Sequence, residues 1–291
     1  MHWSGSQSRH TPAGRVLRTR SGPVSLERVA LVGVINATPD SFFDGGRHQD
    51  PGRAADAARA MVDAGAALLD VGAESTRPGA EPVPADEERR RLLPVLRAVR
   101  AAVAVPLSID TSKAEVARAA LAEGADLVND VSAGRFDAAM LPLVAAERVP
   151  VVLMHMQGTP VTMQDDPRYT DVVREVSAFL AERARAALAA GVAAEAIVVD
   201  PGIGFGKTVE HNCDLLRRLD LVAALGYPVL VGVSRKGFIG RLLGGGAPAE
   251  RLHGTAAAVA LAVAAGARLV RVHDVAAMRD VVRVAEAVIA S

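Results

Sequence analysis

The chain has 291 residues, half of which are apolar, and its 33 basic and 33 acidic residues give a formal net charge of zero. A neutral chain without a long basic run argues against a general electrostatic grip on nucleic acid, so a small-molecule partner is expected. The longest apolar run, about ten residues, is well short of the roughly 20 that span a bilayer, and the single cysteine, Cys213, cannot form an internal disulfide, so we expect a cytoplasmic protein without a membrane segment.

The first 25 residues differ in composition from the rest of the chain. They are rich in Ser, Arg and Gly and contain no acidic residue, but they lack the apolar segment of a secretory signal. We expect residues 1–25 to form a flexible N-terminal tail. A transit role toward an organelle is the alternative interpretation of this segment.

From residue 26 onward, short apolar runs alternate with longer alanine-rich segments. The apolar runs predict strands at residues 31–35, 67–71, 105–109, 127–131, 149–154, 196–199, 228–233 and 269–272. The segments between them predict helices, among them residues 53–64, 86–102, 113–123, 171–190 and 251–265. A glycine follows several of these helices in the position where helices stop, namely Gly65, Gly124, Gly191 and Gly266.

This alternation predicts the fold class. Strands that are buried on both faces form continuous apolar runs, and helical connections between them imply parallel pairing with right-handed crossovers. Eight such units in a row favour an α/β fold with a single (β/α)8 TIM barrel over residues 26–291, with its active site at the C-terminal ends of the strands. An open, doubly wound sheet is the structural alternative.

Every predicted strand ends in polar residues. Any one of them could be a helix cap or a loop hydrogen bond, but the complete set favours a site. The polar positions at the strand ends are Asn36, Asp110, Asn129, His155, Asp200, the segment from Ser234 to Lys236, Arg271 and His273.

The residue types at these ends indicate a site with two parts. Acids and carboxamides such as Asp110, Asp200 and Asn129 can read the edge of a flat heterocycle. Cations such as Lys236 and Arg271 suit a phosphate or diphosphate. Nucleophilic catalysis and a histidine metal cluster both lack a motif, whereas an Mg²⁺ ion held partly by diphosphate needs only one or two protein oxygens.

The stretch "VVDPGIGFGKT", residues 198–208, resembles a phosphate-binding loop. That loop requires four residues between its first glycine and the Gly-Lys-Thr, and only three lie between Gly202 and Gly206. The spacing therefore argues against a nucleotide hydrolase. Lys207 in this stretch is one of only three lysines in the chain, which marks these positions as ones that favour a compact ammonium over a guanidinium.

Eight ordered segments carry a resemblance to one family. The segments are "GVINATPDSFFDGG", "DVGAESTRPGA", "SIDTSKAEVARAAL", "LVNDVSAG", "LMHMQGTPVTMQ", "DPGIGFGKT", "GVSRKGFIG" and "RVHDV". Together they resemble the signature segments of the dihydropteroate synthases, folate-pathway enzymes, over nearly all of the chain beyond the tail. The resemblance implies a transferase that joins 6-hydroxymethyl-7,8-dihydropterin diphosphate to p-aminobenzoate in an SN1-like reaction, usually as a homodimer, and that is a sulfonamide target.

The same resemblance implies roles for particular residues. Pterin binding falls to Asp110, Asn129, Met154, Asp200 and Lys236. Diphosphate binding falls to Asn36, Arg271 and His273, with Mg²⁺ held through Asn36, and the catalytic set is Asp110, Lys236, Arg271 and His273. The p-aminobenzoate pocket and the two closing loops involve Phe42, Asp44, Thr76, Arg77, Pro78 and Phe205.

The sequence departs from the family pattern at three positions. Gly237 stands where a serine is frequent, Phe43 replaces a smaller residue, and Ala73 occupies a place often held by glycine. Two related functions remain as alternatives: a pterin-binding domain of a corrinoid-linked methyltransferase, and a pterin-binding paralogue without activity. The loops and the anion-binding residues argue against both, because methyl transfer has no diphosphate to hold.

Overall fold

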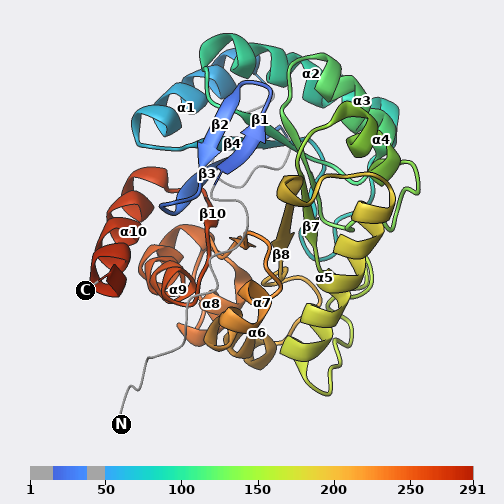
Figure 1. Cartoon of the computed structure of the whole chain (residues 1–291). Coiled ribbons are helices and arrows are strands. Elements are labelled where there is room, and N and C mark those ends of the chain that lie inside the picture. The colour runs from blue at the N-terminus through green and yellow to red at the C-terminus, as the bar shows by residue number, and fades with distance from the viewer. Residues whose placement is uncertain (1–15, 38–49, 291) are drawn as a thin grey trace.

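A computed structural model describes residues 16–37 and 50–290, so that the predictions for Phe42, Phe43 and Asp44 lie outside the described residues. Within this part of the chain, eight parallel strands form one sheet in the order β8-β7-β6-β5-β4-β3-β10-β9. A parallel bridge between Val199 and Val229 joins β8 to β9 and closes the sheet into a barrel (Figure 1). The strands are β3 (Ala30–Asn36), β4 (Leu68–Gly72), β5 (Leu107–Asp110), β6 (Leu127–Asp130), β7 (Val151–Met154), β8 (Ile197–Asp200), β9 (Leu230–Val231) and β10 (Leu269–Val272).

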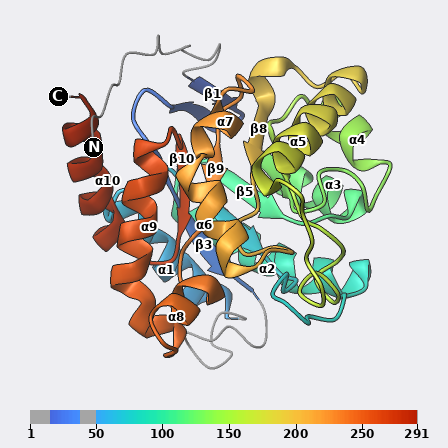
Figure 2. The same ribbon diagram turned by 90° about the horizontal axis from the view of Figure 1, so that it is seen from below.

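Helices surround the strands on the outside of the barrel. They are α1 (Pro51–Asp63), α2 (Ala85–Ala102), α3 (Ala114–Ala122), α4 (Met140–Glu147), α5 (Val172–Ala189), α6 (Val209–Arg217), α7 (Leu219–Ala223), α8 (Gly237–Leu242), α9 (Leu252–Ala264) and α10 (Val275–Ala290). In Figure 2, α10, α9, α6 and α5 follow one another around the barrel, as their contacts require. The predicted barrel is confirmed, and the open sheet is wrong because the sheet has no free edge strand. No helix in the described ranges has the length and apolarity of a membrane span.

Glycines terminate the helices where the sequence predicts. Gly65, Gly124, Gly191 and Gly266 have φ values of 104°, 94°, 97° and 104°, a region that favours residues without a side chain. Each glycine is followed by a short segment that leads directly into the next strand. The local sequence thus sets where each helix turns back toward the barrel.

A β-hairpin precedes the barrel and corrects the expectation of a flexible tail. β1 (Val16–Thr19) pairs antiparallel with β2 (Gly22–Ser25), so residues 16–25 are ordered. Leu17, Val24 and Leu26 are buried against side chains at the N-terminal ends of the barrel strands, namely Ala30, Val32, Leu68, Leu127, Val152, Val198, Leu230 and Leu269. Each large apolar side chain buried in this way contributes about 1.5–3 kcal/mol. The hairpin therefore closes the end of the barrel opposite the strand ends that carry the polar residues.

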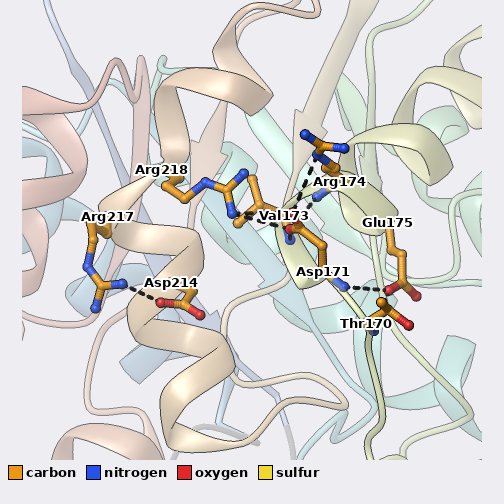
Figure 3. A network of polar contacts seen from close by, with 8 residues as sticks. All are labelled: Thr170, Asp171, Val173, Arg174, Glu175, Asp214, Arg217 and Arg218. Carbon is orange, nitrogen blue, oxygen red and sulfur yellow. Dashed lines mark hydrogen bonds and ion pairs between the residues drawn. The ribbon is translucent and has the colours of Figure 1, made fainter.

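The start of α5 is fixed by a network around Asp171, which Figure 3 shows. The Asp171 side chain accepts hydrogen bonds from the backbone N–H groups of Val173 and Arg174, each at 3.1 Å, and so caps the helix. The Arg218 guanidinium lies 3.3 Å from the same carboxylate and ties α5 to the junction of α6 and α7. This network holds in place the segment that leads into α5 from the site end of the barrel.

Candidate active site

A cavity of about 810 Å³ opens at the C-terminal ends of the strands. It brings together residues that the sequence scatters over more than 200 positions, including Asn36, Thr76, Arg77, Pro78, Asp110, Phe205, Lys236, Arg271 and His273. A narrower pocket of about 20 Å³ lies beside it and is lined by Asp110, Asn129, Met154, Asp200, Phe205, Lys236 and Arg271, among others. Every predicted site residue within the described ranges lines one of the two spaces, and five of them line both: Thr76, Asp110, Phe205, Lys236 and Arg271.

Arg271 links two buried carboxylates at the boundary between these spaces. Its Nε donates to Asp70 Oδ2 at 2.6 Å and its Nη2 donates to Asp110 Oδ2 at 2.9 Å. Asn129 Nδ2 donates to the same Asp70 oxygen at 3.0 Å. A planar guanidinium fits this task because its N–H groups form a fixed fork. The arrangement holds Asp110, Asn129 and Arg271 in one rigid unit.

Sequence reasoning missed Asp70. Its side chain is 1% exposed, and its Oδ1 has no hydrogen-bond partner among the described residues. Asp70 lies inside β4 rather than at its end, so a search of strand ends passes over it. The signal that could have found it is an acid within the apolar run "ALLDVG", since a charged group buried in a strand needs a partner.

The carboxylates of the narrow pocket titrate far from their ordinary range. Burial raises the pKa of Asp110 to about 7, with Asp70 acting in the same direction and Arg271 against it. Burial raises the pKa of Asp200 to about 6, opposed by the hydrogen bond that Gly202 N–H donates to Asp200 Oδ1 at 2.7 Å. Perturbed acids in a cleft are typical of functional sites. Both groups exchange protons near neutral pH.

Lys236 and Phe205 form one wall that both spaces share. The Lys236 Nζ lies 3.9 Å from the centroid of the Phe205 ring, within the range of a cation–π contact. Burial, followed by repulsion from Arg271, lowers the pKa of Lys236 to about 8. Lys236 therefore still carries a proton for most of the time at neutral pH, and its charge faces the acids of the narrow pocket.

His273 lines the larger cavity as a neutral ring. Burial and the guanidinium groups of Arg271 and Arg235 lower the pKa of His273 to about 3. Its Nδ1 lies 3.0 Å from Ser234 Oγ, which also accepts the backbone N–H of His273 at 3.2 Å. The hydroxyl hydrogen of Ser234 can thus be donated to Nδ1, which leaves Nε2–H as the donor toward the cavity. His273 therefore offers the cavity a neutral N–H donor rather than a positive charge.

The loop after β4 carries Thr76, Arg77 and Pro78 and is held by a buried ion cluster. Lys113 Nζ donates to Glu74 Oε2 and to Glu88 Oε2, each at 2.6 Å. Burial raises the pKa of Glu88, whose side chain is fully buried. On the far side of the loop, Gly79 N–H donates to Pro160 O at 2.9 Å. The loop is therefore fixed at its base and meets the loop that follows β7.

The "GIGFGK" stretch does not form a phosphate cradle. The Lys207 side chain is fully buried, and its Nζ donates to the carbonyl oxygens of Gly202 and Phe205 at 2.9 and 2.8 Å. An ammonium that faces carbonyl groups below the cavity cannot reach an anion within it. The exclusion of a nucleotide-binding loop on spacing agrees with this geometry.

Metal binding by protein groups alone finds no support in the part of the chain that the structure describes, where no cluster of three or more His, Cys, Asp or Glu side chains could hold an ion. Asn36 ends β3 and lines the cavity on the same side as Arg271 and His273. One carboxamide oxygen suits Mg²⁺, which keeps several waters and commonly binds through one or two protein oxygens together with phosphates. The donor set fits a metal that enters with an anionic substrate.

Comparison with known proteins identifies relatives over almost the whole chain. Residues 32–273 match a family model described as "Pterin binding enzyme". The dihydropteroate synthase of Synechocystis is 46% identical over 261 residues, which cover 90% of this chain and 90% of that protein.

Solved structures agree with this result. A Xanthomonas albilineans dihydropteroate synthase with 4-aminobenzoic acid is 47% identical, with a TM-score of 0.89 over 96% of this chain and 100% of that one. The Yersinia pestis dihydropteroate synthase in a sulfonamide drug complex is 39% identical, with a TM-score of 0.91 over 95% and 100% of the two chains.

Proposed function

The chain belongs to the pterin binding enzyme family, and we propose that it is a transferase that condenses 6-hydroxymethyl-7,8-dihydropterin diphosphate with p-aminobenzoate. The products are 7,8-dihydropteroate and diphosphate. The observation that carries this proposal is the position of Arg271, which lines both spaces and binds Asp110 of the narrow pocket together with Asp70 buried behind it in β4. One residue thus connects a pocket for a heterocycle to a space for an anion.

The polar groups of the narrow pocket suit the edge of the pterin. Asp110, Asn129 and Asp200 are each no more than 8% exposed and supply acceptors and donors for the polar edge of the ring. Met154, 3% exposed, offers an apolar and polarisable surface for the ring face. A pocket of buried polar groups rejects ligands that leave those groups unpaired, which makes it selective for this heterocycle.

The larger cavity suits the diphosphate and its departure. The bond between the pterin methylene carbon and the diphosphate oxygen breaks first, and the electron pair leaves on that oxygen. Arg271 and the Nε2–H of His273 meet the negative charge that develops there, while ionised Asp110 and Asp200 stabilise the delocalised pterin cation. The neutral arylamine then forms the new C–N bond and loses one proton. The loop with Thr76 and Arg77 excludes water, which would otherwise trap the cation.

Asn36 would hold Mg²⁺ together with the diphosphate oxygens. When bound, the metal would neutralise part of the charge on the leaving group. The support for this assignment is the position of the Asn36 carboxamide, which lines the cavity beside the proposed diphosphate site.

The p-aminobenzoate site lies along the Phe205 wall, with Thr76, Arg77 and Pro78 on the opposite loop. Gly237 also lines this cavity, at the first residue of α8, and a side-chain carbon built there would meet no atom within 4 Å. The space for the serine that is frequent in the family is therefore present. Because the Yersinia relative has been solved with a sulfonamide drug, we propose that sulfonamides compete for this site.

We further propose a cytoplasmic homodimer. Its support is a set of apolar side chains that are unusually exposed on neighbouring helices α9 and α10, which lie side by side in both views (Figures 1 and 2). Leu261, Val284 and Val288 are 61%, 66% and 69% exposed. Association through this face would remove them from water.

Product formation tests the proposed reaction. Purified protein with Mg²⁺ is expected to form 7,8-dihydropteroate from the two substrates and to release one equivalent of diphosphate, because both parts of the site are intact. Chromatography of the pteroate product and a diphosphate assay measure the two yields. Tight pterin binding without either product would contradict the proposal and favour the paralogue without activity.

A further inference from the structure

A loop of residues 202–206 carries the Phe205 wall and has a conformation that depends on glycine. Gly202 and Gly206 have φ values of 67° and 60°. A side-chain carbon at Gly202 would lie 1.9 Å from the carbonyl oxygen of His155, and one at Gly206 would lie 2.8 Å from that of Gln157. The loop therefore packs tightly onto the segment that follows β7.

Side chains from outside the loop bind most of its backbone polar groups. Gln164 Nε2 donates to Gly204 O at 3.0 Å, and Asn212 Oδ1 accepts from Gly204 N–H at 2.6 Å. The Tyr169 hydroxyl donates to Gly206 O at 2.8 Å. Gln164 and Tyr169 belong to the segment between β7 and α5, and Asn212 belongs to α6. The loop is thus held from several sides at once.

Lys207 makes more contacts with this region than any of the three side chains above. Its Nζ lies 3.0 Å from His155 Nδ1, 2.9 Å from Gly202 O and 2.8 Å from Phe205 O. Three acceptors match the three N–H bonds of an ammonium, whereas a neutral amine has only two. Burial lowers the pKa of Lys207 to about 7, and the charge of Asp200 acts in the opposite direction and favours the ammonium. His155 can accept because burial, and then the charge of Lys207, lower the pKa of His155 to about 2 and keep its ring neutral. A guanidinium has no such tripod geometry.

We propose that Lys207 is a positioning residue for p-aminobenzoate: by binding the carbonyl groups of Gly202 and Phe205 from below, it sets the Phe205 ring against Lys236. This inference rests on the proposed function. The ring is attached to the same residue whose carbonyl Lys207 binds, and its face contacts Lys236 Nζ at 3.9 Å. Loss of the ammonium would release the loop and move the ring, although Lys207 itself touches no substrate.

Lys207→Met keeps the length of the side chain and removes the ammonium. Its KM for p-aminobenzoate is expected to rise at least about tenfold, because small displacements of a substrate wall are costly. The affinity for a pterin without diphosphate, measured by calorimetry, is expected to change less than the KM for p-aminobenzoate does, because Asp110, Asn129 and Met154 lie outside the loop, although Gly202 and Phe205 also line the narrow pocket. Leu96→Ala, in the buried face of α2, serves as the matched control for a general loss of stability and should leave this KM unchanged.

A double-mutant cycle with Phe205→Ala separates positioning from a general structural effect. If Lys207 acts through the ring, Lys207→Met has less than about a threefold further effect on this KM once the ring is absent. Equal effects in both backgrounds, or an equal loss of pterin and p-aminobenzoate affinity, would overturn the inference.

If Lys207→Met does not fold, Tyr169→Phe tests whether the bonds to the loop position p-aminobenzoate. It removes a single hydrogen bond to the same loop and is expected to raise the KM for p-aminobenzoate while leaving pterin affinity intact. The matched control is Tyr227→Phe, the other tyrosine of the chain, which precedes β9 at the opposite end of the barrel. An unchanged KM in Tyr169→Phe would also overturn the inference. Absence of product with the wild-type chain, by contrast, would contradict the proposed function itself.

Discussion

Arg271→Ala is expected to lower turnover by about two to three orders of magnitude, because removal of a single charge-stabilising donor costs about 2.7–4 kcal/mol in the transition state. The change removes the cation that meets the leaving diphosphate. It also leaves Asp70 and Asp110 without the guanidinium that lies between them. Since Arg271 lowers the pKa of Asp110, its loss makes Asp110 hold a proton at neutral pH and weakens stabilisation of the pterin cation. Single-turnover measurements of product formation test this expectation.

Binding of a pterin without diphosphate should suffer much less in Arg271→Ala, by under about tenfold or ~1.4 kcal/mol. Arg271→Lys is an informative second variant, because it retains the charge but cannot bind two carboxylates with a planar fork. The matched control is Arg217→Ala, on the surface of α6, whose guanidinium pairs with the exposed Asp214 (Figure 3). Equal losses of turnover and of pterin affinity in Arg271→Ala would show that the anion site lies elsewhere.

The kcat/KM for the pterin substrate is expected to decrease on the acid side of neutrality. Asp110 has a pKa of about 7 and Asp200 of about 6 in the free enzyme. Both stabilise the cation only when ionised, so kcat/KM declines as pH decreases through these values. Between about pH 7 and 6 protonation of Asp110 lowers kcat/KM, and below about pH 6 protonation of Asp200 lowers it further.

Asp70→Asn should shift this acid limb to lower pH. The Asp70 charge raises the pKa of Asp110, and Arg271 divides its hydrogen bonds between the two acids. Asp70→Asn removes that charge and leaves Arg271 to act on the charge of Asp110 alone. The loss of repulsion from Asp70 and the stronger attraction to Arg271 both lower the pKa of Asp110. Substrate ionisation cancels in the comparison because both enzymes use the same substrate. Asp280→Asn, which alters an exposed acid of α10, is the control. A limb that does not move, or that moves upward, would contradict the proposed coupling.

The strands and most of the site could be predicted from the sequence, because in a barrel the short apolar runs mark the strands and the residues that follow them mark the site. Each strand is buried on both faces and so forms a continuous apolar run, and the polar residue that ends it faces the site by topology alone. Asp110 and Arg271 lie 161 positions apart, yet the closed sheet brings them within 2.9 Å. The residues at the strand ends are therefore enough to predict which side chains lie together in the site.

The remaining features depend on packing that a single segment does not reveal. The β1 and β2 strands are four residues each and gain their stability from Leu17 and Val24 against the barrel, so their sequence resembles a tail. Asp70 lies within a strand, and its role follows only from its hydrogen bonds with Arg271 and Asn129, which come from other strands. The neutrality of His273 follows from burial and two nearby guanidinium groups. None of these has a periodic signal.

The central claim is that one pocket binds the heterocycle and the adjoining cavity binds the diphosphate, with Arg271 between them. A crystal structure of the protein with 6-hydroxymethyl-7,8-dihydropterin diphosphate and Mg²⁺ tests it most directly. The account predicts the ring beside Met154, with Asp110, Asn129 and Asp200 within about 3.2 Å of its polar atoms, and the diphosphate against Arg271 and His273 with the metal at Asn36. A ring bound along Phe205, with its diphosphate away from Arg271, would contradict the account.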